Sequence, residues 1–130
     1  MKARQLTVGK LRGLQQIAND RGVFVMLALD HRGSLRQVLH PAAPMHVTYE
    51  AMVDFKLLLT RVLAPHTSAV LLDPVYGAAQ AIGAGALPGR VGLIVSLEES
   101  GYEGEATARY TQLIAGWDVG KVKHMGCLLY

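Results

Sequence analysis

The sequence contains a single cysteine, and this scarcity removes several classes of protein at once. Cys127 has no second cysteine for an internal disulfide, and a cysteine-based zinc cluster needs several thiolates. The five histidines are dispersed, without the spacing of a His-x-His or His-Glu-x-x-His motif, so the sequence predicts no metal site. Low cysteine content is typical of a reducing compartment, and we expect a cytoplasmic protein.

Long hydrophobic runs and an excess of one charge are also missing. No apolar run approaches the roughly 20 residues that span a bilayer, and no signal-peptide core follows the first six residues. The 13 Lys and Arg residues against 10 Asp and Glu give a formal net charge of +3, too mild to indicate nucleic-acid binding. No aromatic residues alternate with the basic ones as a base-stacking platform requires. We expect neither a membrane nor a nucleic acid among its partners.

Apolar segments separated by helical patterns dominate the rest of the sequence. The seven apolar residues at 23–29 predict a strand buried on both faces, as in a parallel sheet. Two further strands are predicted at 69–72 and 91–97. Helices are predicted at 7–18, 35–39, 48–64, 78–82, 106–115 and 118–125, with Ser34, Thr48 and Asp118 as N-caps, and residues 127–130 look like the opening of a fourth strand.

Alternation of strands and helices favours an α/β fold with right-handed crossovers and a parallel sheet. A closed eight-stranded barrel needs around 200 residues or more. The 130 residues therefore predict parallel β/α units that form about half of a (β/α)₈ TIM barrel, in one incomplete domain spanning residues 1–130.

Each predicted strand ends in a carboxylate. Asp30, Asp73 and Glu98 follow the three apolar segments in turn. Because the carboxyl ends of parallel strands meet at one edge of the sheet, we expect the three side chains to lie around one rim. The alternative is that each residue only forms a loop or caps the following helix.

A Schiff-base lysine must be desolvated so that its amine can attack a carbonyl. No lysine of the sequence ends a predicted strand, and we expect Lys56 and Lys121 to lie on solvated helix faces. The residues alone therefore predict no catalytic nucleophile.

Several motifs resemble those of the class I aldolases typified by tagatose 1,6-bisphosphate aldolase, with sulfofructosephosphate aldolase as a close relative. The resemblance extends from about residue 11 to residue 126, and the motifs occur in family order. They are Asp30-His31-Arg32-Gly33, Asp54-Phe55-Lys56, and the segments at 71–77, 98–102 and 116–119.

The resemblance implies a (β/α)₈ barrel that cleaves a phosphorylated ketose into glycerone phosphate and an aldehyde. The family reacts through a lysine Schiff base without a metal, so we expect no cofactor. The chain resembles the N-terminal half only and departs from the family pattern after residue 126, before the Schiff-base lysine. The implied substrate-binding residues are Asp30, His31, Arg32, Asp73 and Glu98, with His31 standing where many members have glutamine.

Two functions stay open. The first is an aldolase of phosphorylated sugars to which this chain contributes rim residues. The alternative is a non-catalytic half-barrel, an interaction module that self-associates or pairs with another chain. Since an open half-barrel leaves strand edges unpaired and its inner face uncovered, we expect a homo-oligomer.

Overall fold

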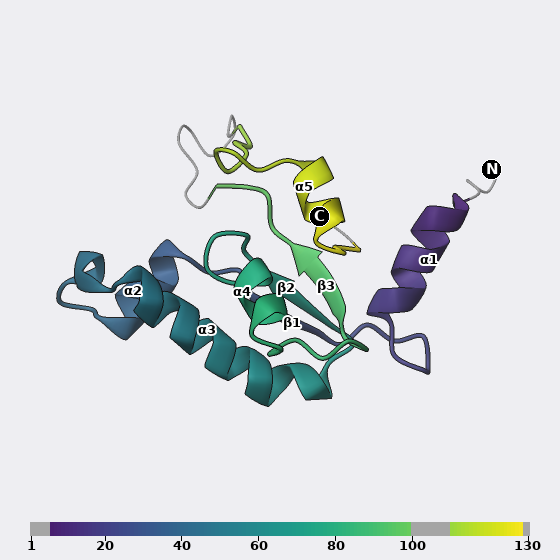
Figure 1. Ribbon diagram of the computed structural model, residues 1–130, viewed down its shortest axis with the longest axis horizontal. Helices are drawn as coiled ribbons and strands as arrows, with labels where there is room; N and C mark the ends of the chain where they lie inside the picture. Colours follow the sequence, from purple (N-terminus) through teal and green to yellow (C-terminus); the bar gives the residue numbers. More distant parts are fainter. Residues whose placement is uncertain (1–5, 100–109, 129–130) are drawn as a thin grey trace.

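A three-stranded parallel sheet forms the centre of the computed structural model, which describes residues 6–99 and 110–128 (Figure 1). The strands β1 (Met26–Leu29), β2 (Ala69–Leu72) and β3 (Gly92–Val95) lie side by side in their sequence order. The α-helices are α1 (Val8–Ile17), α2 (Gly33–Leu39), α3 (Tyr49–Leu63), α4 (Ala78–Gly83) and α5 (Val119–His124), with short 3₁₀ turns η1 (Pro44–His46) and η2 (Ala64–His66).

The strands run in exact step along the sheet. Met26 pairs with Ala69 and Ala69 with Gly92, and the same alignment continues to the last residue of each strand. Helices connect the parallel strands, α2 and α3 between β1 and β2 and α4 between β2 and β3. The predicted α/β class with a parallel sheet is confirmed, whereas half of a (β/α)₈ barrel stays a prediction.

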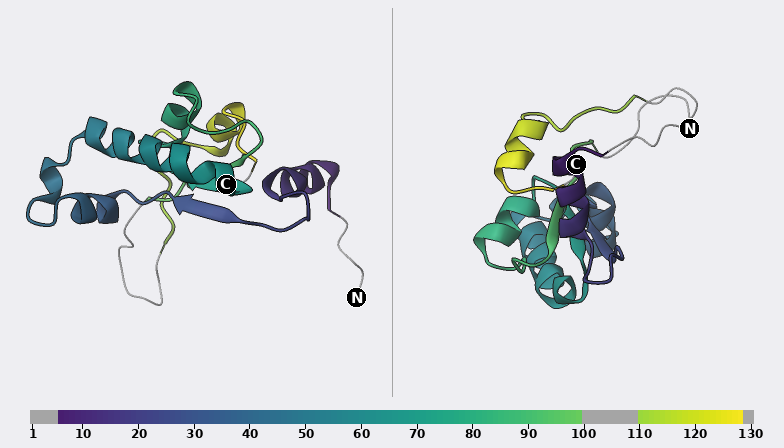
Figure 2. Two further views of the ribbon diagram at one scale, coloured as in Figure 1. Left: turned by 90° about the horizontal axis from the view of Figure 1, so that it is seen from below. Right: turned by 90° about the vertical axis from the view of Figure 1, so that its right-hand side faces the viewer.

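The core lies on one face of the sheet. Alternate strand residues on that face are buried and pack against small side chains of the helices. Figure 2 shows the helices α3, α4 and α5 on the same side of β1, which is the blue arrow in its left view. The core members from the strands are Val70, Leu72, Leu93 and Val95, and those from the connecting segments include Ala64, Ala78, Ala81 and Val122.

Helix α1 packs against the amino-terminal end of the sheet, where the strands begin. The Thr7 side chain caps the helix by accepting from the Lys10 N–H at 3.3 Å, and Ile17 is buried against the start of β3. A Cβ on Gly92 would stand 2.8 Å from both the Gln16 carbonyl oxygen and Ile17 Cγ2. Only glycine permits this close approach of α1 to the sheet.

The prediction that β1 is buried on both faces is wrong. The side chains from Val23 to Met26 are 44–51% exposed, and the strand itself begins only at Met26. The reason is positional, because β1 pairs with β2 alone among the described residues and is an edge strand there. A long apolar run therefore marks an exposed sheet edge in this chain.

Two of the three predicted N-caps are confirmed. Thr48 Oγ1 accepts from the Ala51 N–H at 3.1 Å, and Asp118 Oδ1 accepts from the Lys121 N–H at 2.8 Å. Ser34 does not cap α2, which begins at Gly33, two residues before the predicted start, with Arg32 at the N-cap position.

The helix predicted at 106–115 is not formed in the part that the structure describes. Residues 110–115 are not helical, and Leu113 forms an antiparallel bridge with Glu98 instead. Residues 106–109 lie outside the described residues. Of the predicted fourth strand, 129–130 lie outside as well, while the Leu128 N–H donates to the Leu93 carbonyl of β3 at 2.9 Å without forming a strand.

None of the described helices combines the length and the apolar character needed to cross a membrane.

Candidate functional site

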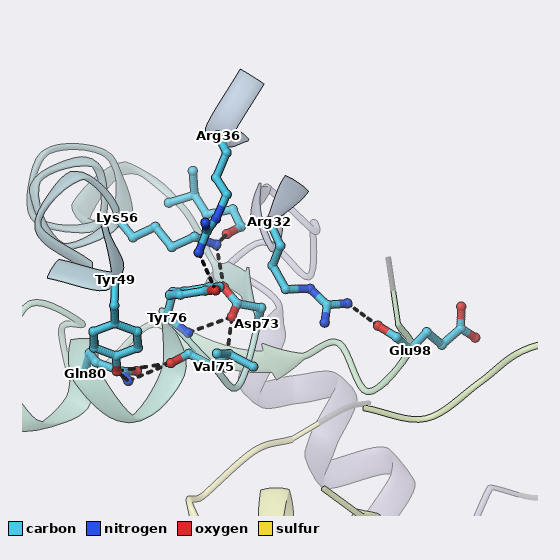
Figure 3. A network of polar contacts seen from close by, with 10 residues as sticks. Arg32, Arg36, Tyr49, Lys56, Asp73, Val75, Tyr76, Gln80 and Glu98 are labelled. Atoms are coloured by element: carbon cyan, nitrogen blue, oxygen red, sulfur yellow. Dashed lines mark hydrogen bonds and ion pairs between the residues drawn. The ribbon is translucent and has the colours of Figure 1, made fainter. Parts of the chain in front are cut away.

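A buried lysine joins the carboxyl ends of β1 and β2. Lys56 lies on the stripe of α3 that faces the sheet, four residues from Met52 and four from Thr60, and all three are buried. Its Nζ donates to the Leu29 carbonyl oxygen at 2.6 Å and forms an ion pair with Asp73 Oδ2 (Figure 3). One ammonium group thus fixes the last residue of β1 to the residue that follows β2.

Asp73 is fully buried, and both of its carboxylate oxygens are occupied. Oδ1 accepts from the backbone N–H groups of Val75 at 2.9 Å and Tyr76 at 2.7 Å, while Oδ2 accepts from Lys56. The carboxylate therefore shapes the turn after β2, as Asp does in Asx turns, and balances the charge of Lys56. Asp73 thus forms a loop, as the alternative states, while its role as a substrate-binding residue of the rim stays a prediction.

The environment of Lys56 acts on its protonation in two directions. Desolvation by burial lowers the pKa of Lys56 below its ordinary value, whereas the hydrogen bond and charge of Asp73 and the charge of Asp30 raise it. Burial is the larger effect, and the nearby Arg32 guanidinium adds to the lowering.

Asp30 lies beside this pair with its carboxylate unengaged. It follows β1 directly, is half-buried, and has no hydrogen bond or ion pair with any residue that the structure describes. It is the residue after Leu29, whose carbonyl oxygen accepts from Lys56 Nζ, and its negative charge raises the pKa of Lys56. The oxygens of Asp30 are therefore available to accept hydrogen bonds from a ligand.

Arg32, the N-cap residue of α2, and Arg36, within the helix, extend over the carboxyl ends of the strands (Figure 3). Arg32 Nη1 forms an ion pair with Glu99 Oε2 at 3.1 Å, and Arg32 Nη2 donates to the Glu98 carbonyl oxygen. One helical turn later, Arg36 Nη2 donates to the Tyr76 hydroxyl at 3.0 Å. Guanidinium groups in this position are suited to carboxylate and phosphate ligands.

Comparison with known proteins identifies the family. The family model described as "DeoC/LacD family aldolase" matches residues 24–128. The chain belongs to the DeoC/LacD aldolase family. The matched range includes β1, β2, β3 and all the residues of the site described above.

Curated relatives of the chain are tagatose 1,6-diphosphate aldolases. The enzyme of Listeria monocytogenes is 36% identical over 124 residues, 94% of this chain and 35% of its own length. Aldolase 1 of Enterococcus faecalis is 32% identical over 123 residues, 95% of this chain and 36% of its own length. Aldolase 2 of Streptococcus agalactiae is 31% identical over 121 residues, with 93% and 36% covered. The chain thus spans about a third of the length of these relatives.

The predicted rim residues of this family member take different positions. Asp73 pairs with Lys56, and the charges of Asp30 and Arg32 act on the pKa of Lys56. Glu98 contributes its backbone oxygen to Arg32, while its side chain is exposed and points away (Figure 3). His31 is exposed and lines a cavity of about 150 Å³ between β1, α2 and α3, together with Ser34 and Lys56.

The expectation that Lys56 lies on a solvated helix face is wrong, because its side chain is 1% exposed. The helical spacing of the sequence could have predicted this burial, because Lys56 lies four residues after Met52 on the buried stripe of α3. A lysine at a core position of an amphipathic helix indicates a buried partner, here Asp73. The other lysine expected on a solvated face, Lys121, is exposed as predicted.

No group of three or more His, Cys, Asp or Glu that could hold a metal ion occurs within residues 6–99 and 110–128.

Proposed function

We propose that this chain forms part of the substrate site of an aldolase that cleaves a phosphorylated ketose, such as tagatose 1,6-bisphosphate, into glycerone phosphate and an aldehyde. The observation that carries the proposal is the edge where β1 and β2 end. A free carboxylate at Asp30 and the guanidinium of Arg32 adjoin the buried Lys56–Asp73 pair there. Membership of the aldolase family and the names of the relatives support the same function.

We assign each side chain of the site a role in binding the ligand or in positioning another residue. Arg32 places a positive charge at this edge, and the guanidinium N–H groups that Glu99 and the Glu98 carbonyl oxygen leave unused can donate to a phosphate group. Asp30 accepts hydrogen bonds from ketose hydroxyl groups, and the exposed ring of His31 is a further donor beside it. Asp73 acts through Lys56 as a positioning residue, and Glu98 holds Arg32 through its carbonyl oxygen.

The Schiff-base lysine of this reaction lies, in our proposal, outside the residues described. Lys56 is the buried lysine of the site, but its Nζ is bonded to Leu29 and Asp73 and its side chain is enclosed. Attack on a ketose carbonyl would require it to leave both partners. We therefore assign Lys56 to holding the two strand ends together. The enzyme that we propose is cytoplasmic and uses no metal.

Titration calorimetry with D-tagatose 1,6-bisphosphate and with inorganic phosphate tests this function. The parent chain is expected to bind the bisphosphate saturably. Arg32→Gln is expected to weaken both ligands about tenfold or more, since a charged hydrogen bond contributes about 1.5–3 kcal/mol. Arg61→Gln, on an exposed position of α3, is the matched control and leaves both dissociation constants unchanged. Equal affinities for the parent and Arg32→Gln would refute the proposed role of Arg32 in phosphate binding.

A second candidate, a half-barrel module that self-associates, has its own observation. Four consecutive apolar side chains, from Val23 before β1 to Met26 at its start, are about half exposed, and β1 is an edge strand among the described residues. Exposed edges with apolar side chains promote pairing with another chain. Sedimentation velocity at micromolar concentration is expected to show a dimer or larger species, and Phe24→Lys is expected to shift it toward monomer. A monomeric parent that melts cooperatively would contradict this candidate.

A further inference from the structure

The ion pair between Arg32 and Glu99 links the two outer strands of the described sheet at its carboxyl end. Arg32 follows the last residue of β1 by three positions, and Glu99 follows the last residue of β3 by four. Arg32 Nη1 lies 3.1 Å from Glu99 Oε2, while Arg32 Nη2 donates to the Glu98 carbonyl oxygen (Figure 3). A carboxylate of the chain is therefore already bound to the guanidinium to which we assign the phosphate group.

The two partners of this ion pair differ in how firmly they are held. The Arg32 side chain is 11% exposed, its Nε atom is buried, and a backbone carbonyl oxygen holds Nη2. The Glu99 side chain is 43% exposed. Because an ion pair with so exposed a member contributes little stability, Glu99 can turn into solvent at small cost while Arg32 stays in place. Nη1 is thus the guanidinium nitrogen that a ligand can reach by displacing a side chain.

The charges at this edge do not favour a phosphate group while Glu99 remains in place. Among the described residues, the cationic side chains are Arg32, Arg36 and Lys56, and the carboxylates are those of Asp30, Asp73, Glu98 and Glu99. The Glu99 carboxylate lies on the nitrogen that the phosphate would use, so it repels the ligand at short range. Its departure removes this repulsion and leaves the positive charge of Arg32 to the ligand.

We propose that Glu99 is an internal competitor of the phosphate group, which takes its place on Arg32 Nη1 when a phosphorylated ketose binds. This inference rests on the proposed function and adds a regulation of the same site. A phosphate monoester carries more negative charge than a carboxylate and has more acceptor oxygens, so it displaces Glu99 from the guanidinium. In the free chain Glu99 neutralises Arg32, and a ligand with hydroxyl groups alone does not remove it.

Titration calorimetry on Glu99→Gln tests the inference, with the 130-residue chain and two probes, D-tagatose 1,6-bisphosphate and inorganic phosphate. Glutamine keeps the size of Glu99 and removes its charge, so both probes are expected to bind about threefold or more tightly. The combined variant Arg32→Gln/Glu99→Gln is expected to show no such gain over Arg32→Gln, because the competition acts through Arg32. Glu50→Gln, which deletes a carboxylate at an exposed position of α3, is the matched control and leaves both dissociation constants unchanged.

Three outcomes would overturn the inference and leave the proposed function intact. Unchanged affinities in Glu99→Gln would mean that the phosphate binds without displacing Glu99. Weaker binding would mean that Glu99 positions Arg32 for the ligand instead of competing with it. A gain that persists in the combined variant would mean that Glu99 repels the ligand without acting through Arg32. If neither the parent chain nor Glu99→Gln bound the bisphosphate, the proposed function and this inference would both be wrong.

Discussion

Replacing Lys56 with methionine should remove a large part of the folding stability of this chain. Methionine keeps the length and the apolar stem of lysine on the buried stripe of α3. It deletes the ammonium group that joins the Leu29 carbonyl oxygen to Asp73. The substitution therefore isolates the contribution of the charge and its hydrogen bonds.

The magnitude follows from the burial of both partners. The Lys56 and Asp73 side chains are 1% and 0% exposed, so the variant leaves a buried carboxylate without its counter-charge. Removing one member of a buried pair costs about 3–5 kcal/mol, and the Leu29 carbonyl oxygen loses its side-chain donor as well. Since a domain of this size is stabilised by about 5–15 kcal/mol, we expect Lys56→Met to be marginally folded.

Urea denaturation followed by circular dichroism, at one protein concentration, measures this cost. Lys121→Met is the control, because Lys121 is exposed, and it is expected to change the free energy of unfolding by less than about 0.5 kcal/mol. The double variant Lys56→Met/Asp73→Asn is expected to cost less than the two single changes together. A loss below about 1 kcal/mol for Lys56→Met would refute the assignment of a structural ion pair at this edge.

Three further results are expected. Burial lowers the pKa of Lys56 in the folded chain below 10.5, so between these two pKa values the unfolded chain binds more protons than the folded chain. The free energy of unfolding of the parent, relative to that of Lys56→Met, should therefore rise with pH in this range. Urea denaturation at several pH values measures this difference, and a difference that does not change with pH would contradict the prediction. Gly92→Ala forces a Cβ against Gln16 and Ile17 of α1 and should destabilise the chain by about 1–3 kcal/mol in thermal melts, whereas Gly89→Ala, with open space around its Cβ, should be close to neutral. Borohydride reduction in the presence of glycerone phosphate should give no covalent adduct by mass spectrometry, because Lys56 is held by two oxygens; a stoichiometric adduct would make the chain a catalyst in its own right.

Periodicity predicted most of the elements because the chain gives strong local signals. The helix at 49–63 combines an apolar stripe with the Thr48 cap and a proline at its end, and it forms as predicted. The helix predicted at 106–115 fails at residues 110–115, where Leu113 bridges to Glu98 instead. Pairing with a residue 15 positions away is a tertiary contact, which helical spacing in a single segment does not encode.

The burial of individual residues was harder to predict than their secondary structure. Residues 23–29 have the composition of a fully buried strand, yet burial depends on which strands lie beside them, and β1 has one neighbour among the described residues. Lys56 shows the converse, since its residue type suggested a solvated face while its position on α3 fixed it in the core. The convergence of Asp30 and Asp73 was predictable from the strand ends alone, but the lysine that joins these strand ends was not.

Amide chemical-shift perturbation by D-tagatose 1,6-bisphosphate would show which end of the sheet binds the substrate. If the substrate binds at the carboxyl ends of the strands, the shifts should cluster at residues 30–36, 73–76 and 96–99. Residues at the other end, including Gln16, Ser68 and Gly92, should not move. Shifts centred on α1 and the start of β3, or an absence of saturable shifts anywhere, would contradict the account.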